Sequence, residues 1–423
     1  MSYDKKTKVD KMTVIAIIFP IILIALDLIN IIVTVGILLF QSIILILKMK
    51  KTHIVLDTKK KNILSIIIIF LLITYLIDLY GKYASSTIIT TTLVFINIIL
   101  IFMISCYTYN KRETFITIVK IFIVFVVFLC IYGLSIRIFG GTPRPYINEN
   151  GEKQYKQVVS IGSINLYQRA MGDSQGRFGV TSLTKNPNTF SYLILYAFVM
   201  NIVIIEINRK QRKNNILNYI YTILFLIGVY IAGSRLAIVL MPFAYILVKL
   251  LQIKNKKSVS LLISAGLILI LVAGIYFTNN LEAIKQIDLN GRDELWRIMP
   301  EVIDSSLFIG QGLDASRNVI LEKTGLDLTM FNSYFTMIAN YGLLITILFY
   351  SVILFLIYKL FVKFSHEDEI LSRKIYLISI ILLIIGLIQG IVENNILRFS
   401  MWNIIYVFLL SMSGMLKDKE KSE

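Results

Sequence analysis

Cysteine and histidine are scarce in this chain, which has two of each among 423 residues. Cys106 and Cys130 both fall inside apolar runs, where free cysteine behaves as a small buried hydrophobic residue. A disulfide framework or a cysteine-ligated metal is therefore not expected. The sequence also lacks a Walker loop, a GxGxxG motif and an HExxH motif. No short catalytic motif indicates what the protein does, and no cofactor or metal is predicted.

Charge is also sparse, because charged residues make up 16% of the chain and hydrophobic residues 57%. Apolar runs of about 18 or more residues recur, and each is long enough to cross the roughly 30 Å hydrocarbon core of a bilayer. These runs are continuously apolar and do not alternate, which favours helices over a barrel. The sequence predicts an all-α membrane protein with one polytopic domain over residues 1–423.

Acidic residues are outnumbered, since 43 lysines and arginines face 26 acidic residues and the formal net charge is +17. In a soluble protein this excess would suggest a nucleic-acid partner. Here much of it lies in short loops between apolar runs, as the positive-inside rule expects, and no nucleic-acid partner is predicted. The lysines before the first apolar run are followed by no small-residue cleavage site, so we expect that helix to be retained.

The alternation of apolar runs and lysine-rich loops predicts the topology. The run 14–47 has lysines at both ends, which favours a hairpin turning near Asp27 and Asn30 over the alternative of one long tilted helix. The further predicted crossings are 63–80, 88–107, 114–136, 189–207, 216–232, 236–251, 259–277, 334–358, 375–391 and 401–415. This gives about twelve transmembrane helices with both termini cytoplasmic. The long polar segments 137–185 and 279–331 are then two outer loops.

Arginine outnumbers lysine in the segments predicted to lie outside. The guanidinium group binds phosphate with two parallel hydrogen bonds, so an arginine-rich outer vestibule suggests an anionic ligand such as a lipid-linked pyrophosphate. The alternative is that these arginines pair with outer carboxylates, which include Asp293, Asp314 and Glu393. His53 and His366 both fall in predicted cytoplasmic loops. General-base chemistry outside would therefore depend on a carboxylate.

The polar stretch 287–344 is the longest interruption in the C-terminal half and the predicted centre of activity. Within it, 292–304 is predicted to form a short amphipathic helix on the outer surface, with Trp296 facing the membrane core. Trp296 and outer tyrosines such as Tyr334 have two interpretations. They could stack on sugar rings, or they could form an interfacial aromatic belt that needs no ligand.

Four local patterns occur in order along the chain. They are RFGVTSLTKNPNTFSY at 177–192, AGSRLAIVL at 232–240, GRDELWRIMPEVIDSSLFIGQG at 291–312 and FNSYFTMIANYGLL at 331–344. Their order and the hydropathy of the chain resemble the superfamily of O-antigen ligases and O-antigen or capsular polysaccharide polymerases. The Asn-Pro-Asn of the first pattern, with Asn186, Pro187 and Asn188, is also ordinary helix-start sequence, with Asn as N-cap and Pro in the first turn.

The resemblance implies a GT-C-like polytopic glycosyltransferase in the bacterial plasma membrane, inverting, metal-independent and facing outside. Its expected partners are a lipid-linked oligosaccharide donor and acceptor, the bilayer, and assembly proteins such as a flippase or a chain-length regulator. The residues expected to hold the pyrophosphate are Arg177, Arg235, Arg292, Arg297 and Arg317. The expected catalytic residues are Asp293, Glu294, Glu393 and Asn332, with Asn188, Trp296 and Tyr334 beside them.

One residue departs from the resemblance. The ligases carry a histidine where this chain has Phe331, which favours a polymerase over a ligase and leaves the base to be assigned among the carboxylates. A flippase of lipid-linked oligosaccharide is the rival from another class. It would need ionisable residues through the bilayer centre and often shows repeated halves, and neither feature is evident in the sequence. A structural subunit of a larger complex is the remaining alternative.

Overall fold

In the computed structural model, the part of the chain that can be described is mainly helical. The structure describes residues 9–28, 30–52, 58–80, 84–147, 153–161, 164–172, 178–252, 298, 307–325, 331–391, 393, 400–414 and 416. The helices in this part are α1 (Lys11–Ala25), α2 (Ile31–Thr52), α3 (Thr58–Tyr80), α4 (Ala84–Cys106), α5 (Lys111–Phe139), α6 (Pro187–Lys210), α7 (Ile216–Ala232), α8 (Arg235–Leu251), α13 (Ala315–Thr324), α14 (Ser333–His366), α15 (Ile370–Gln389) and α16 (Met401–Gly414). The predicted crossing 259–277 and the predicted amphipathic helix 292–304 lie outside the residues that can be described, apart from the single residue 298.

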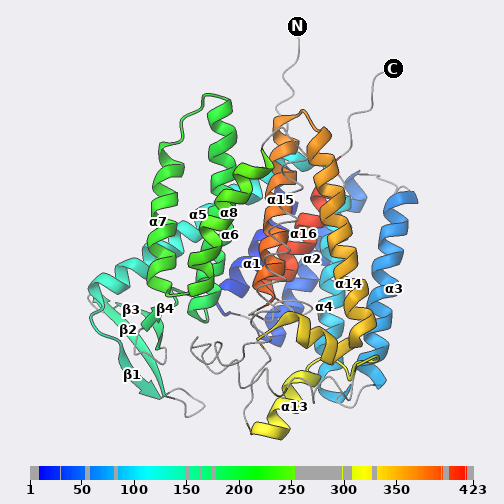
Figure 1. The fold of residues 1–423 in the computed structure, drawn as a ribbon, viewed down its shortest axis with the longest axis horizontal. Helices are drawn as coiled ribbons and strands as arrows, with labels where there is room; N and C mark the ends of the chain where they lie inside the picture. Colours follow the sequence, from blue (N-terminus) through cyan, green and yellow to red (C-terminus); the bar gives the residue numbers. More distant parts are fainter. Residues whose placement is uncertain are drawn as a thin grey trace.

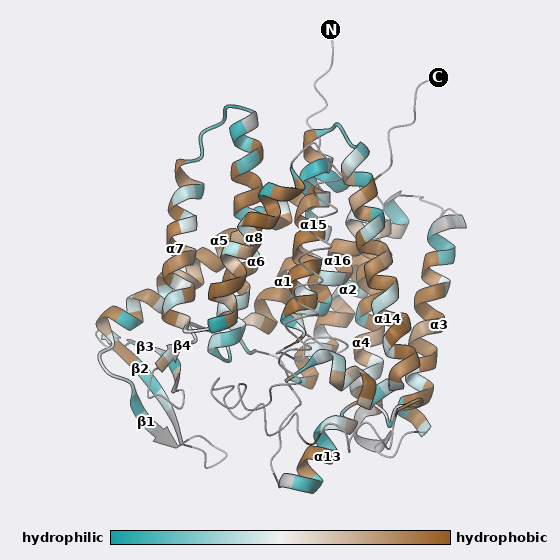
Figure 2. Cartoon of the chain, viewed as in Figure 1, coloured by the Kyte–Doolittle hydropathy of each residue, from teal (hydrophilic) through white to brown (hydrophobic). Residues whose placement is uncertain are grey.

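The membrane character of the chain is confirmed. Among the described helices, six are long and apolar enough to cross a bilayer, namely those at 31–51, 60–80, 111–139, 187–209, 333–366 and 370–389. Shorter apolar helices lie beside them. Figure 2 shows a hydrophobic middle zone of the bundle with hydrophilic residues gathered at its two ends. A multi-pass membrane protein follows, because only such a protein has this number of long apolar helices in one bundle.

The first apolar run forms a hairpin, as the lysines on both flanks predicted. α1 ends at Ala25 and α2 begins at Ile31. Asp27 lies in the turn with a positive φ of 57°, and the Asn30 side chain accepts the backbone N–H of Val33 at 2.8 Å. The turn residues that the sequence singled out therefore end one helix and start the next.

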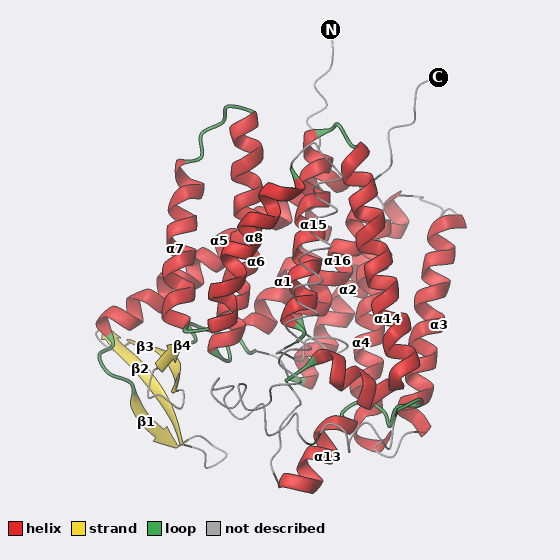
Figure 3. Cartoon of the chain, viewed as in Figure 1, coloured by secondary structure: helices red, strands yellow, loops and turns green. Residues whose placement is uncertain are grey.

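The segment 137–185, which was predicted to be an outer loop, contains a sheet that the sequence did not predict. It has four antiparallel strands in the order β1-β2-β3-β4, namely β1 (Arg144–Ile147), β2 (Lys153–Ile161), β3 (Ile164–Gly172) and β4 (Phe178–Val180). Figure 3 shows this sheet beyond the ends of the helices. This position agrees with the rule that open sheet edges do not occur within the hydrocarbon of a bilayer. The Tyr132 hydroxyl of α5 donates to the carbonyl of Tyr167 at 2.8 Å, which ties the sheet to the bundle.

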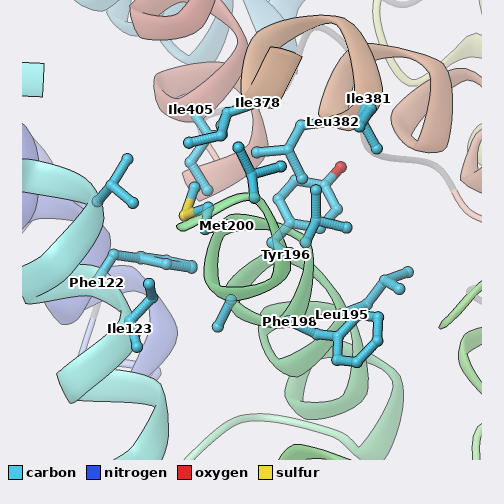
Figure 4. Close-up of a cluster of buried hydrophobic side chains, with 14 of the residues drawn as sticks. Phe122, Ile123, Leu195, Tyr196, Phe198, Met200, Ile378, Ile381, Leu382 and Ile405 are labelled. Atoms are coloured by element: carbon cyan, nitrogen blue, oxygen red, sulfur yellow. The ribbon is translucent and has the colours of Figure 1, made fainter. Parts of the chain in front are cut away.

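The core of the bundle lies between α5, α6, α15 and α16. Figure 4 shows Phe122 of α5, Tyr196 of α6, Leu382 of α15 and Ile405 of α16 meeting there. These four side chains are all at most 3% exposed. α6 is the central helix, because 94% of its most apolar stretch is buried. Close packing around α6 fixes the positions of both of its ends.

The two ends of the bundle carry different structures. The sheet and α13 lie at one end, and the turns between α6 and α7 and between α14 and α15 lie at the other (Figure 1). Lysine and arginine are frequent in the second group of turns. We refer to the first as the sheet end and to the second as the lysine-rich end.

Candidate functional site

At the sheet end, α6 and α14 each begin with an asparagine cap. The Asn332 side-chain oxygen accepts the backbone N–H groups of Tyr334 and Phe335, both at 3.0 Å. Asn186 accepts the N–H of Thr189 at 2.7 Å, and Pro187 follows in the first turn of α6. The helix-start interpretation of Asn186 and Pro187 is therefore confirmed. Each cap satisfies backbone donors that would otherwise be unpaired at a helix start.

The start of α14 also holds the turn that follows α15. The Asn332 amide donates to the carbonyl of Ile391 at 2.8 Å, and the Ser333 backbone N–H donates to the carbonyl of Gly390 at 2.7 Å. The Ser333 hydroxyl donates to the carbonyl of Glu393, also at 2.7 Å. Asn332 is 5% exposed and Ser333 is fully buried. The cap residues of α14 thus set the position of Glu393.

The carboxylate of Glu393 is held by α6. The Asn188 side-chain amide donates to Glu393 Oε1 at 2.8 Å, across 205 positions of sequence. Both side chains are half-buried. Since Ser333 binds the main chain of Glu393 and Asn188 binds its side chain, the carboxylate has a defined orientation where α6, α14 and α15 meet. An oriented carboxylate in this position is suited to accept a proton from a hydroxyl group.

Arg235 begins α8 at the same end. Gly233, with a positive φ of 73°, ends α7, and Ser234 and Arg235 follow directly. A Cβ atom on Gly179 of β4 would lie 2.4 Å from the carbonyl oxygen of Ala232 and 3.2 Å from Cβ of Pro187. β4 is therefore packed between the end of α7 and the start of α6, and only glycine fits there. The exposed Arg235 lies at a helix start, where the helix dipole also favours an anion.

α14 is broken nine residues after its start. Gly342 has φ 82° and ψ 165°, which is not helical. The segment 307–312 fills the break, because Gly312 N–H donates to the Asn340 carbonyl at 2.9 Å and Leu343 N–H donates to the Leu307 carbonyl at 2.7 Å. A Cβ on Gly310 would lie 2.0 Å from the Asn340 oxygen. The two glycine-bearing patterns, GQG and YG, therefore pack against each other through their main chains.

A buried carboxylate that the sequence analysis did not select fixes this segment. Asp78 of α3 is fully buried and accepts hydrogen bonds from the Thr91 hydroxyl at 2.8 Å and from the backbone N–H of Leu313. Asp78 is the acidic residue within the predicted crossing 63–80. A carboxylate inside an apolar run is a signal for a functional or structural site, and it would have found this residue.

The helices α7 and α8 and the first part of α14 lie in a region that is similar to a known family. Residues 220–350 match the family model described as O-antigen ligase. The resemblance predicted from the ordered motifs is confirmed over these residues. The match supports a membrane function of the O-antigen ligase or polymerase kind. Comparison with curated proteins gave no match.

The matched region 220–350 contains three of the four motifs, and the structure explains their glycines and cap residues. Ser234 and Arg235 form the junction of α7 and α8, the GQG residues fill the break in α14, and Asn332 caps α14. The first motif precedes this region, and it contributes Gly179 and Asn188 to the same end of the bundle. The patterns that carried the resemblance thus come together in space where they can be described.

Three predicted site residues have contacts that define their surroundings. Tyr334 donates its hydroxyl to the Leu387 carbonyl at 2.8 Å and stacks on Tyr350 with ring centroids 4.5 Å apart. Its ring is packed between helices, so a contact with a sugar stays a prediction. The Asn332 side chain is used on both its oxygen and its nitrogen, which makes it a positioning residue in this arrangement. Arg317 is half-buried on α13, which docks on α14.

The remaining predicted residues cannot be placed relative to Glu393. Arg177, Arg292, Asp293, Glu294, Trp296 and Arg297 all lie outside the residues that can be described. Arg169 of β3, another arginine that was predicted to lie outside, pairs with Asp27 at 3.4 Å, as the alternative interpretation expects. Pairing with a carboxylate therefore accounts for Arg169.

Proposed function

We propose that this protein is a polysaccharide polymerase that acts at the outer face of the bacterial plasma membrane. It would transfer a growing glycan from its undecaprenyl diphosphate carrier to the non-reducing end of the next lipid-linked repeat unit. The O-antigen ligase match and the multi-pass helical architecture support the general class. Phe331, which stands where the family's ligases have histidine, supports the polymerase over the ligase.

The proposed reaction needs one base and one anion-binding group. The acceptor hydroxyl oxygen forms a bond to the anomeric carbon from the face opposite the diphosphate, the bond from that carbon to the diphosphate oxygen breaks, and the configuration inverts. The hydroxyl proton passes to a carboxylate, and the diphosphate leaves as an anion. No metal is needed if arginines stabilise the charge that develops on the leaving diphosphate.

The single observation that carries this proposal is the hydrogen bond from Asn188 to Glu393. It gives Glu393 a fixed orientation at the junction of three helices, which a general base requires. Among the candidate carboxylates we therefore assign the base to Glu393, ahead of Asp293 and Glu294. Arg235 is assigned to the pyrophosphate, together with Arg177, Arg292, Arg297 and Arg317.

The ligase remains the second candidate, because the matched family model is described as O-antigen ligase. A ligase would transfer finished glycan to a different acceptor, and it would need the same donor site. The two functions differ in the acceptor, that is, in the molecule whose hydroxyl group gives its proton to the base. The lipid-linked intermediate that accumulates when transfer stops distinguishes the two functions.

The test replaces Arg235 with alanine in cells that depend on this protein for surface glycan. Arg169→Ala is the matched control, because Arg169 also lies at the sheet end, pairs with Asp27, and is not assigned to the pyrophosphate. A polymerase predicts that single repeat units accumulate on the outer leaflet and long chains disappear in Arg235→Ala only. Long chains that stay on the lipid would indicate a ligase. Units trapped on the inner leaflet would indicate a flippase and would overturn the proposal.

A further inference from the structure

The lysine-rich end contains a cavity that the proposed transfer reaction does not use. It has a volume of about 730 Å³ and lies between α5, α6 and α15. Three lysines line it: Lys120 from α5, Lys213 from the turn after α6, and Lys374 from the first turns of α15. Figure 1 shows this end of α6 and α15 opposite the sheet. Three separate elements therefore bring cations to one cavity.

The lysines are close enough to affect one another. Lys374 is only 7% exposed, and Lys120, Lys213 and Glu113 line the same cavity. Burying a lysine beside two others is unfavourable unless an anion compensates the charge. The cavity therefore has a physical reason to bind a negative group.

The carboxylates around the cavity offset only part of this charge. Glu113, Asp368 and Glu369 line it together with the three lysines. Glu369 pairs with Arg112 at 2.9 Å, so its charge is already offset. Three lysines then face two carboxylates, which leaves one positive charge among the described lining residues.

The rest of the lining is both apolar and hydrogen-bonding. Ile116, Ile204 and Leu371 contribute hydrocarbon surface, and Asn208 and Asn214 contribute amides. The cavity lies where membrane helices end, the depth at which lipid headgroups meet water. A soluble anion would use the lysines but would leave the apolar lining uncovered. A lipid would use both.

We infer that this cavity binds the phosphate headgroup of an anionic membrane lipid, with Lys120, Lys213 and Lys374 as its cationic contacts. The site is separate from the proposed transfer site. Asn188 and Ile204 are sixteen residues apart on α6, which corresponds to roughly 24 Å along a helix. The headgroup of a lipid bound here therefore lies at the lysine-rich end and does not reach Glu393.

The test compares lipid binding by the purified full-length protein and a charge variant. Native mass spectrometry measures phosphatidylglycerol retained by the wild type, by Lys120→Gln/Lys213→Gln/Lys374→Gln, and by a control that removes the same charge elsewhere. The control is Lys50→Gln/Lys51→Gln/Lys359→Gln, because these three lysines are exposed and do not line the cavity. The double variant Lys120→Gln/Lys213→Gln changes only exposed lysines, so it tests the site even if replacing Lys374 impairs folding.

The expected result is a fall in bound phosphatidylglycerol of roughly 100-fold in the triple variant and roughly 30-fold in the double variant, since each lysine near an anionic headgroup contributes about 1 kcal/mol and 1.4 kcal/mol is a tenfold change in affinity. Phosphatidylcholine should be retained weakly by all variants. An equal fall in the control triple would overturn the proposal, because it would reflect overall charge. Displacement of the lipid by millimolar glycerol 3-phosphate would show a site for soluble phosphate and would overturn the assignment to a lipid.

Discussion

The two ends of the helix bundle are held together by different kinds of contact. At the sheet end, uncharged groups predominate in the described contacts of the site: Asn332 and Ser333 bind main-chain carbonyls, and glycines bring main chains into direct contact. At the lysine-rich end, ion pairs connect helices, as Lys249 of α8 does with Glu206 of α6 at 2.6 Å. Lys48 and Asp10 form a buried pair between α2 and the start of α1.

This difference indicates which end tolerates change. A partly exposed ion pair contributes at most about 1 kcal/mol, because water and salt screen it. A glycine whose main chain contacts another main chain directly leaves no room for a Cβ atom. Any larger residue there must displace backbone atoms, which costs more free energy than the loss of an exposed ion pair. Substitutions at the sheet end are therefore expected to have larger effects than comparable substitutions at the lysine-rich end. Four experiments test this comparison, and they run from the largest expected effect to the smallest.

Replacing Gly310 with alanine should destabilise the protein by at least ~3 kcal/mol, because the new Cβ would overlap main-chain atoms. That Cβ would lie 2.0 Å from the Asn340 carbonyl oxygen. Gly36→Ala is the control, since nothing lies within 4 Å of its position on α2, and it should change stability by no more than about 1 kcal/mol. Thermal unfolding in detergent measures both variants. Equal stability of the two variants would show that segment 307–312 does not pack against the break in α14 through direct main-chain contacts.

Replacing Glu393 with glutamine should lower the rate of glycosyl transfer by roughly 10²-fold to 10⁴-fold while the protein still folds. The substitution keeps an oxygen that accepts from Asn188 and removes the group that accepts the proton. Transfer between purified lipid-linked repeat units, followed by product size, gives the rate. Glu367→Gln at the lysine-rich end is the control and should keep the wild-type rate. If the Glu393→Gln variant had normal activity, Glu393 would not be the base, and the base would be reassigned to Asp293 or Glu294.

Replacing Asn188 with alanine should lower kcat by roughly 10-fold and leave the KM for the donor nearly unchanged, because Asn188 positions the base and does not bind the donor. Asn188→Asp should be worse than alanine, since it sets a negative charge 2.8 Å from Glu393 Oε1. Steady-state kinetics with varied donor separate the two constants. A rise in KM with unchanged kcat would instead indicate that Asn188 contacts the donor.

Replacing Lys249 with glutamine should change the free energy of unfolding by less than about 1 kcal/mol, because Lys249 is 37% exposed in its pair with Glu206. The effect should shrink further at high salt. Unfolding at low and high ionic strength measures it. A loss comparable to that of Gly310→Ala would break the comparison between the two ends.

Sequence reasoning located the long apolar helices of the described region but did not predict α13, which lies in the predicted outer loop 279–331. The expected run 216–232 coincides with α7, and the expected hairpin at Asp27 separates α1 from α2. The sheet in 137–185 was missed, because the search for long apolar runs does not detect short polar strands. Asp78 could have been selected as a carboxylate inside an apolar run, but its partner, the backbone N–H of Leu313, lies 235 positions away and could not be predicted.

The sequence by itself determined that the chain is a membrane protein, approximately where its described membrane helices lie, and which family it resembles. These properties depend on local composition, on cap residues and on ordered motifs, so they can be read along the chain. Only the tertiary structure decided that Asn188 holds Glu393, that Gly310 fits into the break before Gly342, and that Lys120, Lys213 and Lys374 share a cavity. Those contacts depend on how helices distant in sequence pack, and helix packing is set by side-chain shapes across the whole bundle.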